Sequence, residues 1–290
     1  MKIILSRKGF DTGSGGCPSP IFPDGSLMSL PIPDKKSQIT YGEIAGNQWA
    51  SIGEVVSQLA GIPPTHRAHL DPDLFPGSIP RQKDWCPIFG QVGASEGHLR
   101  RQHVGAGDIF LYFGLFRPVE QTGSRLHFVR GSKPIHILFG WLQIAHRVAV
   151  SEWPASQCWA LYHPHFSREP QPSNVLYLST DQLVLPQCEI PGVSGTGAFP
   201  WYSENLRLTA PNSSRPSQWL LPEWFCPDER GSCLSYHGNP SRWEKIDGGI
   251  LLSAVSRGQE FVLDCERFPE AVEWLKWILN SAQHPGGNSG

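Results

Sequence analysis

The sequence predicts an α+β fold, in which a mainly antiparallel or mixed sheet is flanked by a few helices and joined by long loops rich in proline and glycine. The 290 residues include 30 glycines and 27 prolines, which indicates many turns and few long helices. Apolar, strand-like segments follow one another through the middle of the chain with gaps of hairpin size, which favours antiparallel pairing. Helical patterns stand before and after these strands, as expected for this class.

The first third of the chain contains a short strand and one clear helix. Residues 3–5 are apolar and lead into a polar loop dense in glycine and proline. Thr40, with Glu43 three residues later, has the pattern of a capping box that opens a helical stretch. Apolar residues then recur at helical spacing up to Gly61, where the helix is expected to end. A proline-rich loop is predicted over residues 62–88.

The middle of the chain is predicted to form a short helix and a series of strands. Ser95 is a suitable N-cap for a helix over residues 96–103, which Gly105 would close. The strands that follow are predicted at residues 109–116, 126–130, 135–150 and 175–179.

The last part of the chain is predicted to add a hairpin and a helix. Residues 249–255 and 260–265 are expected to pair with each other as strands. An amphipathic helix follows over residues 269–282, with a proline in its first turn. We expect one globular domain over residues 1–282 and a disordered tail over residues 283–290, although the rise in glycine, proline and serine over residues 190–215 also permits a domain boundary there.

The charge and hydropathy of the chain exclude two classes of partner. The net charge of −2 gives no general attraction to the phosphates of duplex DNA. A nucleotide, a single base or a peptide remains possible as a substrate. No apolar run reaches the 18 or so residues that cross a membrane. The seven cysteines contain no C-x-x-C pair and the N-terminus does not resemble a signal peptide, so we expect reduced thiols and a cytoplasmic location.

Two pairs of residues are candidates for binding a metal ion. His69 and Asp71 are two positions apart, as are His163 and His165, and in extended backbone such side chains point the same way. Imidazoles together with a carboxylate form the facial triad of non-haem Fe(II) sites. The sequence therefore predicts a divalent-metal site, with Fe(II) as the preferred ion. The alternative is that these are loop histidines with hydrogen-bonded partners.

The polar loop after the first strand supplies three further candidates. Lys8 can hold a phosphate or a carboxylate, and Asp11 can act as a general base. Ser19 is a candidate for binding substrate, but its context does not match the nucleophile elbow of a serine hydrolase. The alternative is that Asp11 and Ser19 satisfy backbone N–H groups of their own loop.

Three more candidates lie around the predicted short helix. Gln91 belongs to a glycine-bearing segment and can read a base edge or an amide. Trp85 stands in a loop, where its ring can form one wall for a flat ligand. His98 can shuttle a proton. The alternative for this region is a tight turn followed by an ordinary helix cap, with the aromatic rings packed in the core.

Several of these segments, in this order, resemble the nucleotide modification associated domain 3 family of bacteria and phages. The likeness covers about residues 1–265 and rests on the segments around residues 7–11, 16–21, 69–74, 89–94, 98–99, 107–111 and 163–165. The family was proposed to take part in the hypermodification of bases in DNA. The resemblance therefore implies a role in modifying a base or nucleotide, and it does not specify the reaction.

Three functions remain open on the sequence. The first is a metal-dependent enzyme that modifies, by oxidation or otherwise, a nucleobase, a nucleotide or a peptide side chain. The second is a metal-free module, similar to the PUA-like barrels, that binds a modified base. The third is a metal-independent transferase that holds a phosphorylated donor. Convergence of His69, Asp71, His163 and His165 within about 5 Å of one point would favour the first, since ligation requires it.

Overall fold

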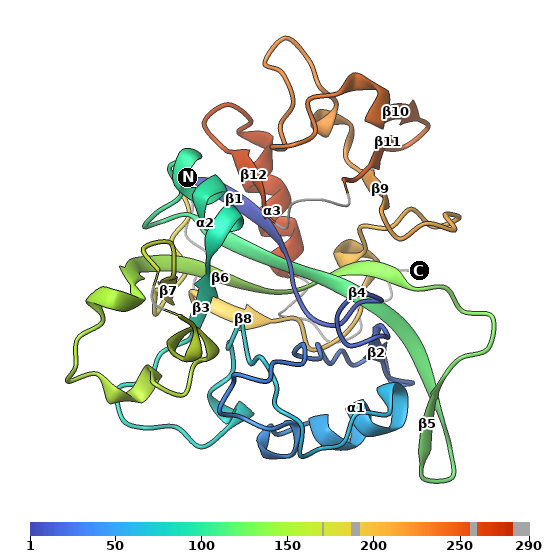
Figure 1. Cartoon of the computed structure of the whole chain (residues 1–290). Helices are drawn as coiled ribbons and strands as arrows, with labels where there is room; N and C mark the ends of the chain where they lie inside the picture. Colours follow the sequence, from blue (N-terminus) through green and yellow to red (C-terminus); the bar gives the residue numbers. More distant parts are fainter. Residues whose placement is uncertain (170, 187–191, 256–259, 281–290) are drawn as a thin grey trace.

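The computed structural model describes residues 1–169, 171–186, 192–255 and 260–280. The predicted tail over residues 283–290 lies outside this part of the chain. Within it, the fold is the predicted α+β arrangement: a large mixed sheet of nine strands, a second sheet of three strands and a low helix content (Figure 1).

The large sheet has β4 and β6 at its centre. Its order is β12-β1-β4-β6-β7-β3, and three further strands pair with the central ones: β2 and β5 with β4, and β8 with β6. The strand β1 runs parallel to β4, whereas β6 is antiparallel to both β4 and β7, as predicted for the strands in the middle of the chain. The strands are β1 (Lys2–Arg7), β2 (Ser19–Ile21), β3 (Ile88–Gln91), β4 (Ile109–Thr122), β5 (Arg125–Phe128), β6 (Ile135–Ala149), β7 (Val175–Ser179), β8 (Thr196–Ala198) and β12 (Glu260–Asp264).

The predicted hairpin near the C-terminus is wrong. The strand β11 (Gly249–Ser253) pairs with β10 (Trp243–Ile246) and β9 (Gln218–Leu221) in the second sheet. The strand β12 instead returns to the N-terminus and pairs with β1, so that Ser6 lies opposite Glu260. Almost all of β12 is buried, and its apolar side chains pack together with those of β1 in the main core. This pairing places Glu260, at the start of β12, beside the end of β1.

The helices differ from their predicted limits. The helix α1 (Ile52–Ala60) begins with its own capping box, formed by Ser51 and Glu54. The box predicted at Thr40 exists, but it caps only a short 3-10 turn. The helix therefore starts later than predicted, because the chain between the two boxes is irregular.

The helix α2 (Gly93–Arg101) begins before Ser95, which is therefore not its N-cap. The helix α3 (Glu270–Asn280) buries its apolar face in the main core, as its pattern predicted. None of the described helices is long and apolar enough to cross a bilayer. The start of α2 follows β3 directly, and this junction forms part of the site.

Candidate metal centre and substrate cavity

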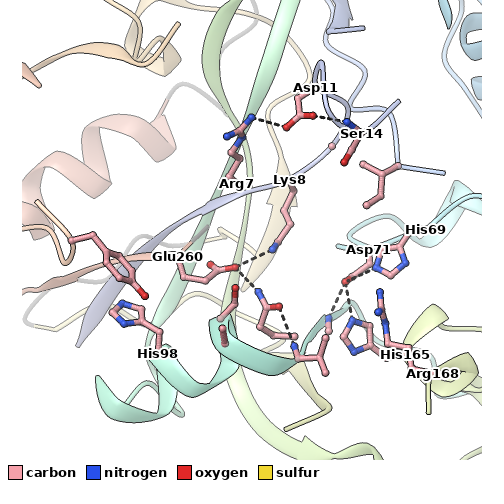
Figure 2. A pocket seen from close by; sticks show the side chains of 18 residues that line it. Arg7, Lys8, Asp11, Ser14, His69, Asp71, His98, His165, Arg168 and Glu260 are labelled. Carbon is pink, nitrogen blue, oxygen red and sulfur yellow. Dashed lines mark hydrogen bonds and ion pairs between the residues drawn. The ribbon is translucent and has the colours of Figure 1, made fainter. Parts of the chain in front are cut away.

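A cavity of about 670 Å³ opens where β1, the junction of β3 and α2, and the start of β12 meet two loops (Figure 2). The loop after β1 lines it with Lys8 and Asp11. The loop before β3 contributes His69 and Asp71, and the loop before β7 contributes His165. Segments that are far apart in the sequence thus share one polar cavity, and the polar loop after the first strand is part of it.

Three of the predicted metal ligands converge at one side of this cavity. His69, Asp71 and His165 offer ligand atoms that all lie within 4.8 Å of one another. The Oδ2 atom of Asp71 is 3.5 Å from Nε2 of His69 and 3.6 Å from Nε2 of His165. All three side chains are nearly buried, with exposed fractions of 9% or less. This is a set of two imidazoles and one carboxylate with room for a small cation among them.

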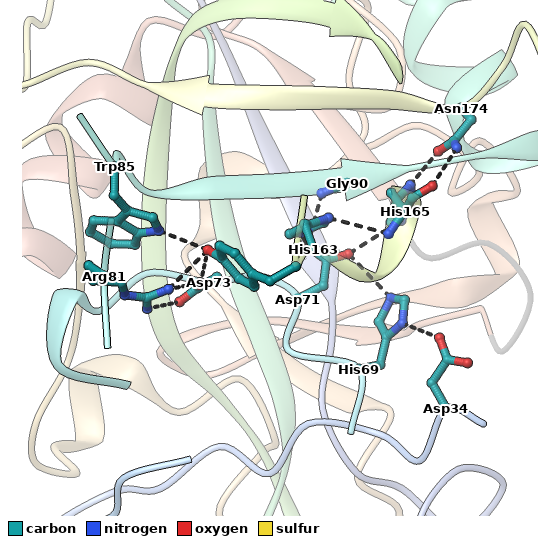
Figure 3. Close-up of polar contacts among 11 residues, drawn as sticks. Asp34, His69, Asp71, Asp73, Arg81, Trp85, Gly90, His163, His165 and Asn174 are labelled. Carbon is teal, nitrogen blue, oxygen red and sulfur yellow. Dashed lines mark hydrogen bonds and ion pairs between the residues drawn. The ribbon is translucent and has the colours of Figure 1, made fainter. Parts of the chain in front are cut away.

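The tautomers of the two imidazoles follow from their other contacts (Figure 3). Nδ1 of His69 lies 2.7 Å from a carboxylate oxygen of Asp34, which can only accept. Nδ1 of His165 lies 2.5 Å from Oδ1 of Asn174, whose amide nitrogen donates to the His165 carbonyl. Each Nδ1 therefore carries a hydrogen, as is usual for metal-binding histidines. In the neutral rings, both Nε2 lone pairs face an ionised oxygen of Asp71, so the three atoms need a proton or a cation between them.

The titration of Asp71 and His69 agrees with a site that favours positive charge, whereas burial lowers the pKa of His165 and keeps that ring neutral. Burial opposes the ionisation of Asp71, but the contacts from three neighbouring imidazoles outweigh it and hold its pKa well below the usual range. Burial also opposes the charged form of His69, yet its contacts with Asp34 and Asp71 outweigh this and raise its pKa. The hydrogen bond from His69, more than any other contact, lowers the pKa of Asp34 to about 2.

The fourth predicted ligand, His163, lies behind the carboxylate rather than at the cavity. Its side chain is fully buried, and its Nε2 is 3.4 Å from Oδ1 of Asp71. The backbone N–H of Gly90 donates to the same Oδ1 at 2.9 Å. Because His163 does not line the cavity, we assign it to holding the carboxylate in place. The facing atom, Oδ2, remains directed at the two other imidazoles.

A buried network joins the two loops that carry these residues (Figure 3). Asp73 is completely buried and accepts two hydrogen bonds of 2.7 Å from the guanidinium of Arg81. The hydroxyl of Tyr162 donates to Asp73 at 2.5 Å, and the indole N–H of Trp85 donates to that hydroxyl at 2.8 Å. Since Tyr162 immediately precedes His163, this network fixes the position of one loop against the other.

The side of the cavity opposite to His69, Asp71 and His165 is built on Glu260. Its Oε1 atom accepts hydrogen bonds from Nζ of Lys8 at 2.9 Å and from Nε2 of Gln91 at 2.5 Å. Nε2 of His98 contacts the hydroxyl of Ser235 at 3.0 Å, and burial lowers the pKa of this histidine. This side of the cavity therefore contains three of the candidate residues from the sequence, Lys8, Gln91 and His98. Glu260 was not predicted, because it was assigned only to a strand.

Asp11 lines the cavity, but its carboxylate is engaged by its own loop. Its Oδ1 accepts from the backbone N–H groups of Gly13 and Ser14, both at 2.7 Å. Its Oδ2 accepts from Arg7 at 2.6 Å. This geometry matches the alternative interpretation, in which the carboxylate stabilises the loop, and it leaves no oxygen of Asp11 directed at the metal ligands.

Two residues that were predicted to bind substrate, Ser19 and Trp85, do not line this cavity. Ser19 is 1% exposed, and its hydroxyl accepts from the backbone N–H of Leu30, so that it holds two loop segments together. Trp85 belongs to a small apolar cluster, and the guanidinium of Arg81 lies 4.1 Å from the centre of its ring. Its aromatic face is thus covered by the chain itself.

Sequence reasoning missed Asp34, Asp73 and Asn174. A signal existed only for Asp73, which is the second aspartate of His-Leu-Asp-Pro-Asp and lies two positions after Asp71 in the same polar segment.

Comparison with known proteins identifies one family. The family model described as nucleotide modification associated domain 3 matches residues 2–264, which is most of the chain. No curated protein and no solved structure matches the chain.

Proposed function

Because the chain belongs to the nucleotide modification associated domain 3 family, we propose that it is a divalent-metal enzyme that modifies a nucleobase or nucleotide. The observation that supports this most directly is the arrangement of Nε2 of His69, Oδ2 of Asp71 and Nε2 of His165, three acceptor atoms that face one another at the wall of a cavity. The net charge of −2 favours a single base or nucleotide over duplex DNA as the substrate.

The preferred ion is Fe(II), because two imidazoles and one carboxylate are the donor set of non-haem iron sites that keep open positions. Such an ion would activate oxygen or water at the positions that the protein leaves free. The chain's own contribution is to orient the donors. Asp34 and Asn174 hold the two rings by their Nδ1–H groups, and Gly90 holds the far oxygen of Asp71.

The two alternatives receive less support. A metal-independent transferase requires the histidines to lie apart, whereas three of the four predicted ligands converge. A PUA-like module would be a barrel, whereas the described strands of the large sheet form an open order with β12 and β3 at its ends. Tight binding of a modified nucleoside, without turnover under any divalent metal, would still favour such a binding module.

The test is elemental analysis of protein that is purified without oxygen. We expect about one iron per chain in the wild type and almost none in the variants Asp71→Asn and His165→Gln, because each removes one of three ligands. A matched control is His66→Gln, which changes an exposed histidine three residues before His69. This control should keep the wild-type metal content.

Two results would contradict the proposal. One is full metal content in both ligand variants, which would place any bound ion elsewhere. The other is a wild-type protein that takes up no Fe(II), Mn(II), Co(II) or Zn(II) when each is added to the metal-free chain. Circular dichroism of every variant checks that a loss of metal does not simply report unfolding.

A further inference from the structure

The carboxylate of Glu260 is only partly satisfied by the protein. The residue is 1% exposed and lines the cavity. Its Oε1 accepts from both Lys8 and Gln91, whereas its Oε2 has no hydrogen-bond partner within the part of the chain that the structure describes. A buried acceptor without a donor is costly, and such groups often mark a binding position. The missing donor would be supplied by a ligand in the cavity.

The neighbours of Glu260 restrict the chemistry of that ligand. The ammonium of Lys8 already balances the charge of the carboxylate at 2.9 Å, so a neutral N–H donor fits better than a second cation. Lys8 and Gln91 each donate one hydrogen to Glu260 and have others left over. The three residues therefore present an acceptor next to donors, which complements a ligand edge with an N–H beside an acceptor atom.

An aromatic wall stands beside this polar edge. Tyr236 lines the cavity with 48% of its surface exposed, and its ring lies 4.3 Å from the ring of His98. Tyr236 also has a backbone φ of 68°, a left-handed conformation that is unusual for an aromatic residue and is found at ligand clamps. An exposed ring held in this way offers a face on which a flat heterocycle can stack.

We propose that this side of the cavity binds the base of the substrate and selects one whose Watson–Crick edge carries an exocyclic amino group beside an unprotonated ring nitrogen, which means cytosine or adenine. The amino N–H would be donated to Oε2 of Glu260, and the neighbouring ring nitrogen would accept from Gln91 or Lys8. The base would stack on Tyr236. This inference rests on the proposed function, since it takes a nucleobase as the substrate, and it adds which bases are accepted and which residues select them.

Thymine and uracil fit this edge less well. Their only Watson–Crick donor is an N–H that lies between two carbonyl oxygens, so a carboxylate that accepts from it also approaches two negatively polarised atoms. The amino group of cytosine or adenine has a carbonyl-free side, and glutamate is an established acceptor for the cytosine amine. The selection is thus expected to come from Glu260 rather than from stacking, which tolerates every base.

Binding of dCMP, dAMP, dTMP and deoxyribose 5-phosphate to the purified, oxygen-free protein tests this inference by calorimetry. We expect dCMP or dAMP to bind about tenfold more tightly than dTMP, and the sugar phosphate to bind most weakly. In Glu260→Gln the preference should fall to near unity or reverse, because the amide can donate to a carbonyl of thymine. In Tyr236→Ala all three nucleotides should bind about tenfold more weakly while the preference is kept.

The controls separate this inference from the proposed function. Glu244→Gln changes an exposed glutamate of β10 and should leave every dissociation constant at the wild-type value. Glu260→Gln should also keep its metal, because Glu260 is not among the three converging ligands. A normal base preference in protein that binds no metal would contradict the proposed function and support this inference. Full metal content without a base preference would support the proposed function and contradict this inference.

The inference is overturned if wild-type protein binds dTMP as tightly as dCMP and dAMP, or binds none of the nucleotides. It is also overturned if Glu260→Gln keeps the full preference. Should Glu260→Gln fail to fold, the wild-type preference and the Tyr236→Ala variant decide the question, since the exposed side chain of Tyr236 can be shortened without opening the core.

Discussion

Two groups of buried histidines stand in different parts of this molecule and have different surroundings. His69, His163 and His165 gather around one carboxylate at the cavity, with exposed fractions of 7%, 0% and 2%. His136 and His237 lie in the interior with exposed fractions of 7% and 0%. Burial therefore does not distinguish the two groups, and their partners do.

The histidines of the interior are each satisfied by uncharged groups. Nδ1 of His136 accepts a hydrogen bond of 3.0 Å from the indole of Trp219. His237 lies 2.8 Å from the carbonyl of Ser235 through Nδ1 and accepts from the backbone N–H of Val255 through Nε2. Burial is the main cause that lowers the pKa of His136 to about 3 and that of His237 to about 4. Both rings are thus fixed in their neutral form.

At the cavity, the carboxylate of Asp71 changes this balance. It is shared by three imidazoles, and two of them are oriented from behind so that their Nε2 atoms face it. The pKa of His69 is consequently raised even though the ring is as buried as His136. The difference teaches that a ligand site is marked by convergent acceptors with outer partners, and that a buried histidine alone is ordinary core.

The largest effect is expected from crowding the cavity group without touching a ligand. A Cβ atom added at Gly90 would lie 2.4 Å from Cδ2 and 2.6 Å from Nε2 of His165, so the ring must move. Gly90→Ala should therefore weaken metal binding by roughly 100-fold, the upper end of what disturbing a ligand's support costs. It should also lower the free energy of unfolding of the metal-free chain by about 1–3 kcal/mol, as overpacking does. Competition with a chelator of known affinity measures the first effect.

The matched control is Gly105→Ala, because nothing lies within 4 Å of a Cβ atom at that position. It should leave metal affinity unchanged. If Gly90→Ala bound metal as tightly as Gly105→Ala, the position of the His165 ring would not matter for the ion, and the contrast between the two groups of histidines would lose its basis.

The second-largest effect is a loss of stability at low pH that the buried histidines of the interior cause. His136 has a folded pKa of about 3, whereas an unfolded histidine takes up a proton near pH 6.5. The unfolded state therefore binds more protons as the pH falls, and the stability that the neutral ring provides above pH 6.5 is lost between pH 6.5 and 3. At pH 5 the loss is about 2 kcal/mol for this one group.

Urea unfolding from pH 8 to pH 5 measures this loss, with His136→Gln for comparison. The glutamine can still accept from Trp219 but does not titrate. The free energy of unfolding of the variant should therefore fall less steeply with decreasing pH than that of the wild type. Near pH 5 the difference between the two slopes should correspond to the uptake of about one proton on unfolding. Equal slopes for the two proteins would show that His136 is protonated in the folded state. The metal content should be the same in both.

The sequence predicted which side chains converge at the cavity but not what orients them. The two-residue spacing of His69 and Asp71 indicated the site, because side chains two positions apart point to the same side of an extended chain. Asp34 and Glu260 carried no such signal, because each is a single polar residue, and their partners His69 and Lys8 lie 35 and 252 positions away. Such contacts depend on which strands pair, and the pairing of β12 with β1 was not predictable from a local pattern.

The same limit applied to the fold. The central strands β4 and β6 were predicted because their long apolar runs are buried almost throughout, and their short connection made them antiparallel. The second sheet was missed because β9 and β10 are short and only partly buried, so they show neither a continuous apolar run nor clear alternation.

The smallest effect is expected from a histidine that belongs to neither group. His127 is 47% exposed on β5 and lies 3.2 Å from the half-exposed Glu120 on β4, its cross-strand partner. An exposed pair of this kind contributes less than about 1 kcal/mol, since water and salt screen it. His127→Gln should therefore leave the metal content close to that of the wild type and change the free energy of unfolding by less than about 1 kcal/mol. A loss of metal in this variant would mean that distant histidines influence the cavity, and neither burial nor a shared carboxylate would then define the site.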